Sequence, residues 1–237
     1  ADRKSAQIIF TTHSEYATAS LPAEAVWAAV DGTAIQGKLD IHSLRSLTGE
    51  VSSKLVIYTE DSFSKKWMEA IIRLDSEIAF DAIEVYPMGG DGTAVKVNEY
   101  HNLDPSNKVK SICMIDGDSQ QVDNSDKRVF RLPGESPELH IFDEICDKLE
   151  DCAPILAVRV MRKYTDAEAV KSIVKTVGNT NRDHHLIFSQ IGEKVGFVSE
   201  NIIIDAFLTT WCEHYPDEVA KILDQIREFL PRISDKT

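Results

Sequence analysis

A short apolar stretch that ends in two aspartates constrains this chain more than any other feature of its sequence. Ile112-Cys113-Met114-Ile115 is followed directly by Asp116-Gly117-Asp118. An apolar run of this length between polar residues is typical of a strand buried in an α/β sheet. Such sheets bind ligands at the carboxyl ends of their strands, and the glycine allows a sharp turn between the two carboxylates. The stretch predicts either a Mg²⁺ or Mn²⁺ site at a strand tip or an ordinary surface turn.

Strands and helices alternate around this stretch. The apolar spacing predicts strands at 55–58, 83–86, 112–115 and 129–132. Helical spacing predicts amphipathic helices at 62–74 and 93–101. This order of elements predicts an α/β fold with a mostly parallel sheet flanked by helices.

The sequence changes character after Pro133-Gly134. From there on, apolar residues recur almost throughout at helical spacing. The expected helices span 137–149, 153–163, 166–177, 184–194, 200–214 and 218–230. We therefore expect an all-helical C-terminal region after the sheet.

The first fifty residues are expected to form strands and one short helix that precede the α/β sheet. Residues 7–14 are expected to form a strand that ends at a polar tip, and this tip contains His13. A second strand at 25–30 is joined by an Asp-Gly turn to a partner at 33–39, which predicts a β-hairpin. A short helix is expected at 40–47.

Composition narrows the class of protein. Hydrophobic residues make up 43% of the 237 residues, which is enough for a sizeable core. No apolar run approaches the roughly 18 residues of a membrane span, and no apolar signal segment follows the first residues. The cysteines lack CxxC pairing, so we expect a cytoplasmic protein without a membrane partner and with reduced, buried thiols. The net charge of -13 disfavours non-specific nucleic-acid binding by the whole surface. Such contacts would need a local basic patch, a bound metal or parts of the protein outside this sequence.

Three carboxylates are expected at one edge of the sheet. Glu60 follows the strand at 55–58, and Asp116 and Asp118 follow the strand at 112–115. Carboxylates that converge without a cation raise one another's pKa, so such a cluster points to a divalent metal. A metal bound to a phosphate oxygen stabilises the charge that develops during displacement at phosphorus. The alternative is three independent, solvated strand ends.

Glu60 with the Asp116-Gly117-Asp118 strand resembles the Toprim domain, the Rossmann-like metal-binding fold of topoisomerases, bacterial primases and several nucleases. The segment around His13 resembles the switch-histidine strand near the end of an ABC-type ATPase domain. The two in succession resemble the OLD (overcoming lysogenisation defect) family of ATP-dependent nucleases, many of them linked to phage defence. The resemblance covers roughly residues 6–150. It implies an ATPase remnant at 1–50, a Toprim catalytic domain at 51–150 and a helical domain at 151–237.

This resemblance implies a metal-dependent DNA endonuclease that nicks or cleaves DNA with two Mg²⁺ or Mn²⁺ ions. Carried over by position, Glu60, Asp116 and Asp118 would be catalytic metal ligands, and Asp61 and Glu138 are further metal-ligand candidates. Ser64 stands where the family has a second acidic residue, which puts one metal position in doubt. The lysine that such nucleases use is expected among Lys163, Lys171 and Lys175, with Lys163 as the first candidate. The alternative function is a non-catalytic Toprim module that regulates or binds nucleic acid.

The same resemblance carries expectations about the whole protein. No Walker A pattern occurs, so this chain is expected to be a fragment that does not hydrolyse ATP. ATP would act only in the full-length protein, where His13 would sense the nucleotide. A homodimer or higher oligomer through the missing ATPase part and a partner protein in a defence system are further expectations.

Three other features leave alternatives open. A local excess of basic residues is either a DNA-backbone contact or a solvated helix face, and it comprises Arg159, Arg162, Lys163, Lys171 and Lys175. Gly89-Gly90-Asp91-Gly92 is either a tight turn, with Asp91 extending the acidic edge, or a phosphate cradle. Asp183 is expected to cap the helix that His184 and His185 open, and these histidines have either a structural role or a role next to the metal.

Overall fold

The computed structural model describes residues 9, 11, 21–30, 33–37 and 53–233, which fall into two compact units, Ala1–Ser52 and Ser53–Thr237. In the first unit a short 3-10 turn, η2 (Ala23–Ala25), precedes β1 (Trp27–Val30) and β2 (Thr33–Gln36). These two strands pair antiparallel, which confirms the predicted hairpin. His13, the helix expected at 40–47 and most of the strand expected before His13 lie outside the described residues.

The second unit contains a sheet of four parallel strands in the order β4-β3-β5-β6. Its strands are β3 (Leu55–Thr59), β4 (Ile83–Pro87), β5 (Lys110–Ile115) and β6 (Val129–Arg131). All four lie where the sequence predicts them. The α/β fold class with a parallel sheet is therefore confirmed.

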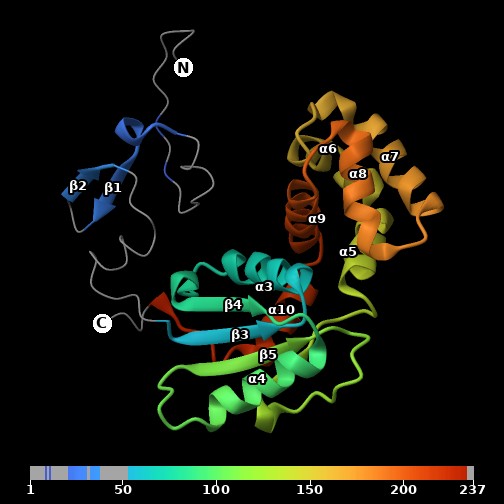
Figure 1. Ribbon diagram of the computed structural model, residues 1–237. Coiled ribbons are helices and arrows are strands. Elements are labelled where there is room, and N and C mark those ends of the chain that lie inside the picture. Colours follow the sequence, from blue (N-terminus) through green and yellow to red (C-terminus); the bar gives the residue numbers. More distant parts are fainter. Residues whose placement is uncertain (1–8, 10, 12–20, 31–32, 38–52, 234–237) are drawn as a thin grey trace. The chain divides into compact units, whose positions relative to one another are not determined.

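Helices α3 (Ser62–Leu74) and α4 (Asp91–Leu103) cover opposite faces of this sheet (Figure 1). The alternation of side chains along β5 shows the two faces. Cys113 and Ile115 pack with Ala94 of α4, whereas Ile112 and Met114 belong to the larger core that contains α3. Each strand is thus buried on both sides, as continuous apolar runs in parallel sheets require.

The region after the sheet is helical, as expected. Its helices are α5 (Pro137–Asp147), α6 (Leu149–Arg159), α7 (Ala167–Thr180), α8 (Ile187–Gly196), α9 (Glu200–His214) and α10 (Pro216–Ile226). Short 3-10 turns in this unit are η3 (Phe80–Ala82), η4 (Ser125–Lys127), η5 (Tyr164–Asp166) and η6 (His184–Leu186).

Several helix boundaries differ from the sequence prediction by up to four residues, and the largest differences are in α6 and α10. α6 begins at Leu149 instead of residue 153, so Pro154 lies inside the helix and not in its first turn. Leu149 is fully buried, and its packing favours the extra turn despite the cost of an interior proline. α10 begins earlier than expected because Pro216 fits the first helical turn, where its missing N–H costs nothing.

The end of the chain returns to the first part of the second unit. The amide of Ala79 donates to the carbonyl of Pro231 at 2.8 Å, and the amide of Ile233 donates to the carbonyl of Glu77 at 2.8 Å. α9 also packs on α3, where the rings of Trp67 and Trp211 meet edge to face with centroids 5.2 Å apart. The sheet and the helices therefore share one core, and the domain limits at 51–150 and 151–237 stay a prediction.

The cysteines are free, and three of them, Cys113, Cys152 and Cys212, are buried, in agreement with reduced core thiols. Cys146 is partly buried against the same core. No single described helix is long and apolar enough to cross a membrane. The segments His184–Gly196 and Glu200–His214 reach that length and composition only as a pair bent by 106°.

Candidate metal centre

The predicted acidic edge exists because β3 and β5 are neighbours. The two strands run parallel, and Thr59 at the end of β3 pairs with Met114 near the end of β5. Glu60 and Asp61 follow β3 directly, and the Asp116-Gly117-Asp118 turn follows β5. Parallel strands bring the residues beyond their carboxyl ends to the same edge of a sheet. The structure thus places the predicted carboxylates on one side of the fold.

Asp61 closes the turn between β3 and α3. Its Oδ1 accepts hydrogen bonds from the backbone amides of Phe63 and Ser64, both at 2.9 Å. An aspartate at this N-cap position satisfies amides that the first turn of a helix leaves unpaired. One oxygen of Asp61 is therefore committed to the backbone, and only Oδ2 is left for a metal.

Ser64 holds Asp116 in place. Its side chain is fully buried, and its Oγ donates to Oδ1 of Asp116 at 2.6 Å. The position thus carries a hydrogen-bond donor that orients Asp116, instead of the second acid that the resemblance in sequence would lead one to expect. A donor on one oxygen of Asp116 leaves the other oxygen for a cation.

Burial raises the pKa of Asp116 to about 7, and the charges of Asp61, Glu60 and Glu138 act in the same direction. The hydrogen bond from Ser64 lowers this pKa but does not offset burial. Burial also raises the pKa of Glu60, followed in effect by the charges of Asp91, Asp118 and Asp61. The edge therefore holds more negative charge than its own hydrogen bonds neutralise.

The chemistry of the donor set fits a hard divalent cation. Oε2 of Glu60 is buried and has no hydrogen-bond partner among the described residues. Asp116 is 5% exposed, and Asp118 is exposed at the open end of the turn. Carboxylate oxygens are the ligands that Mg²⁺ and Mn²⁺ prefer. In this structure the carboxylate oxygens of Glu60, Asp116 and Asp118 are spread too widely for one atom from each to lie within 4.8 Å of the other two.

Arg131 on β6 fixes the aspartate turn, and sequence reasoning missed it. Its Nη1 donates to the carbonyls of Asp116, Gly117 and Ser119 at 3.0, 3.0 and 3.1 Å. Its Nε pairs with Asp123 at 2.9 Å. A guanidinium with several donors in a fixed plane suits such a cluster of carbonyls. The signal in the sequence was an arginine inside an otherwise apolar strand.

The glycine-rich turn after β4 supports Glu60. The amides of Gly89 and Gly90 donate to the carbonyl of Glu60 at 2.8 and 3.1 Å, and both glycines have positive φ angles of 75° and 152°. These amides are therefore used within the chain, which favours the tight turn over the phosphate cradle. Asp91 accepts from Ser119 Oγ at 2.7 Å, a bond that lowers its pKa and adds a stable negative charge to the edge.

Glu138 and His185 bring the helical region to the acidic edge. Glu138 is 7% exposed, and its Oε1 lies 2.9 Å from Nδ1 of His185. This hydrogen bond is the main cause that raises the pKa of His185, and the charges of Asp183 and Asp61 contribute. Asp183 caps η6 by accepting from the amide of His185 at 3.1 Å, as predicted. Of the two roles left open for His185, the position next to the candidate metal ligands is therefore favoured over a purely structural role.

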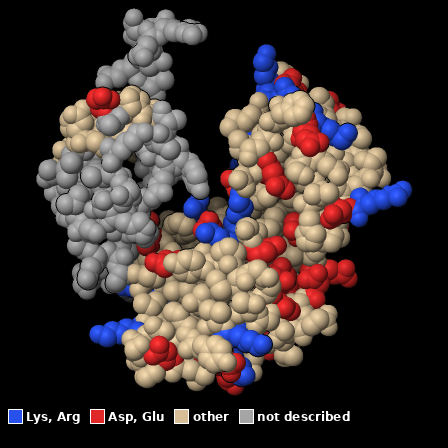
Figure 2. Space-filling view, in the orientation of Figure 1, with Lys and Arg blue, Asp and Glu red and all other residues tan. Residues whose placement is uncertain are grey.

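The predicted basic patch is largely paired with acids. Arg159 forms an ion pair with Glu213, and Lys175 pairs with Glu150 at 2.9 Å. Lys171 pairs with Glu150 and with Glu168, both at 2.8 Å. Figure 2 shows Lys and Arg as scattered projections on the face that it draws, without a continuous basic surface. These contacts favour the solvated helix face that the sequence left as the alternative.

Lys163 and Arg162 lie in the exposed segment between α6 and α7. Within the described part of the chain, no hydrogen bond or ion pair links the side chain of Lys163 to Glu60, Asp116 or Asp118. The role of Lys163, the first lysine candidate, therefore stays a prediction.

The raised pKa of Asp116 predicts a pH-dependent stability in metal-free buffer. Between pH 3.8 and about 7 the folded state keeps a proton that the unfolded state releases, so this contribution to stability is lost as pH rises. Melting temperatures measured in EDTA across this range should rise for Asp116→Asn relative to the wild type as pH increases. Parallel pH profiles of the two proteins would contradict the assignment.

No protein-family model and no curated protein matches this sequence. Among solved structures, the C-terminal region of the Xanthomonas campestris pv. campestris OLD protein is similar, with 14% identical residues and a TM-score of 0.40. The match covers 74% of this chain and 93% of that chain.

Proposed function

We propose that this chain is a metal-dependent DNA endonuclease that hydrolyses phosphodiesters with Mg²⁺ or Mn²⁺. The observation that carries the proposal is the acidic edge around Asp116, a buried carboxyl group with a pKa of about 7. Excess negative charge at the carboxyl end of a parallel sheet can bind divalent cations, and these cations can in turn bind a phosphate. A purely structural role would not need so many unneutralised carboxylates.

The side chains have distinct tasks in this proposal. Glu60, Asp116 and Asp118 would hold one cation, and Asp61 and Glu138 are the candidates for a second position. A divalent cation bound there would polarise a phosphate oxygen and lower the pKa of a bound water. Ser64 orients Asp116 and Arg131 fixes the turn, so both are positioning residues.

His185 adds positive charge next to the carboxylates. Its side chain is 63% exposed, and the hydrogen bond to Glu138 favours its protonated form. An exposed imidazolium beside an acidic edge can contact a phosphate of the substrate. This role does not depend on Lys163.

The larger setting is part of the same proposal. The chain would be the nuclease part of an ATPase–nuclease, with ATP binding and oligomerisation in a region before it. DNA is the proposed substrate, and phage defence with a partner protein is the proposed context. The OLD-type sequence motifs support this setting.

The direct test is cleavage of supercoiled plasmid by the purified chain with Mg²⁺, Mn²⁺ or Ca²⁺. We expect nicked or linear product with Mg²⁺ or Mn²⁺ and none with EDTA. Glu60→Gln should abolish this activity and leave the melting temperature near that of the wild type. Glu84 lies near the start of β4, away from the carboxyl ends of the strands, so Glu84→Gln serves as the matched control and should cleave normally.

A second function is favoured by the hydroxyl at Ser64. If wild-type protein binds DNA and divalent metal but produces no cleavage under any of these ions, the chain is a non-catalytic binding module. Ser64→Glu would then restore the acid of the Toprim pattern. Gain of cleavage in that variant would assign the loss of activity to this position.

A further inference from the structure

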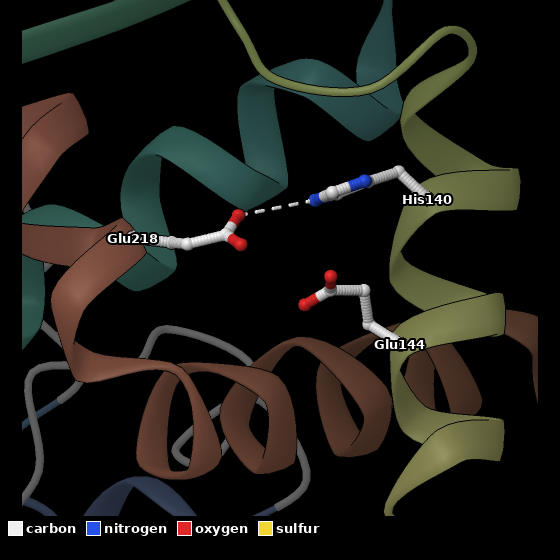
Figure 3. A group of neighbouring side chains, drawn as sticks. All are labelled: His140, Glu144 and Glu218. Atoms are coloured by element: carbon white, nitrogen blue, oxygen red, sulfur yellow. Dashed lines mark ion pairs between the residues drawn. The ribbon is translucent and has the colours of Figure 1, made fainter.

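A second group of metal-ligating side chains lies on α5 and α10, apart from the residues proposed for catalysis. His140 and Glu144 are one helical turn apart on the same face of α5. Glu218 comes from the first turn of α10 and points toward them (Figure 3). One ligand atom from each of the three side chains lies within 4.8 Å of the other two.

The imidazole of His140 is held in an enclosed position. Its side chain is 14% exposed, and its ring centroid lies 5.6 Å from that of Trp67 and 6.2 Å from that of Trp211. Its Nε2 is buried and makes no hydrogen bond among the described residues, although Oε2 of Glu218 is 3.4 Å away. A buried polar atom without a hydrogen bond is costly, so a ligand for this nitrogen would be stabilising.

Glu144 is oriented by neighbours outside the cluster. Its Oε2 accepts from Nε1 of Trp211 at 3.1 Å. The backbone carbonyl of the same residue accepts from the hydroxyl of Tyr215 at 2.7 Å. Outer hydrogen bonds of this kind fix the orientation of a metal-binding carboxylate and leave its second oxygen free.

We infer that His140, Glu144 and Glu218 bind Zn²⁺ or a similar late first-row divalent ion. One imidazole nitrogen and two carboxylate oxygens match the ligands that zinc takes, and a water would complete four-coordination. Mg²⁺ is a poor match because it avoids nitrogen ligands. The ion would link α5 to α10 and so stabilise the packing of α10 within the second unit. The competing explanation is an ion pair between protonated His140 and Glu218.

The test is a titration with Zn²⁺, and with Co²⁺ as a spectroscopic probe, in excess Mg²⁺. The titration uses the Asp116→Asn variant, so that zinc binding at the carboxylates around Asp116 does not contribute to the signal. We expect one equivalent of Zn²⁺ by calorimetry and a visible Co²⁺ absorption band. At a 100-fold excess over Kd, zinc should raise the melting temperature by about 5–10 °C.

Two variants and one control separate the alternatives. Glu218→Gln and His140→Ala should each weaken zinc affinity by about 100-fold or more, whereas the exposed Glu228→Gln should not. Glu218→Gln keeps the shape of a partly exposed residue, so it remains informative if His140→Ala does not fold. Absence of zinc binding, or equal affinity in wild type and Glu218→Gln, would overturn the inference and leave the ion pair. Neither outcome bears on plasmid cleavage.

Discussion

Gly117→Ala is expected to destabilise the protein by about 3 kcal/mol, the upper part of the range for an overpacked site. A Cβ at this position would lie 1.7 Å from the carbonyl oxygen of Gly134 and 2.6 Å from its carbonyl carbon. Both are backbone atoms, so no side chain can rotate out of the way. The φ angle of Gly117 is not positive, and the cost therefore comes from lack of space alone.

Gly92→Ala is the matched control for this prediction. Its Cβ would meet only the side-chain nitrogen of Gln121, at 3.6 Å, and the residue lies in the first turn of α4. Alanine is favoured over glycine in a helix by about 1 kcal/mol, so we expect unchanged or higher stability. Urea unfolding of both variants measures the difference. Equal free energies of unfolding for Gly117→Ala and the wild type would mean that the turn lies apart from Gly134.

Asp116→Asn is expected to reduce metal-dependent DNA cleavage by about 10²–10³-fold, comparable to the loss of one electrostatic group in other active sites. The substitution keeps the shape of the side chain, and Oδ1 of the asparagine can still accept from Ser64. It removes the charge that a cation would bind. The effect should therefore appear in cleavage rates and metal affinity while the folded structure persists.

Asp126→Asn is the control for that experiment, because Asp126 is an exposed aspartate in η4. Initial rates of plasmid nicking at saturating Mg²⁺ give the comparison, with circular dichroism to check folding. If Asp116→Asn cleaves like the control, the acidic edge does not bind the catalytic ion and the proposed mechanism fails.

Much of the fold follows from the sequence because it depends on local patterns. Continuous apolar runs identified the strands, and helical spacing identified the helices that cover them. The position of Glu60 near Asp116 followed from a single assumption, that β3 and β5 are adjacent and parallel, and the register of Thr59 with Met114 confirms it. Asp183 as a cap was likewise a local prediction.

The remaining site residues were not predictable because their roles come from contacts between distant segments. Ser64 reaches Asp116 from α3, Arg131 reaches back from β6, and His185 reaches Glu138 from η6. None of these pairs has a fixed spacing that a motif could report. Asp91 was named as an extension of the edge, and its charge does act on Glu60.

For the basic residues, the sequence predicted a feature that the folded structure largely neutralises. Counting charges between 159 and 182 indicates an excess of basic residues, but apart from Glu168 their neutralising partners lie elsewhere in the chain. Glu150 on α6 takes both Lys171 and Lys175, and Glu213 on α9 takes Arg159. Local net charge in a sequence therefore overstates the charge that a folded helical surface presents.

The backbone bridge between Ile78 and Arg232 has a consequence for synthesis on the ribosome. The loop before β4 pairs with a segment that is synthesised much later, and Trp67 of α3 likewise contacts Trp211 of α9, a helix made long after it. Contacts between such distant segments slow folding and leave apolar surface uncovered in the nascent chain. Premature termination before α10 should therefore yield an aggregation-prone product, even though every strand of the sheet would already have been translated.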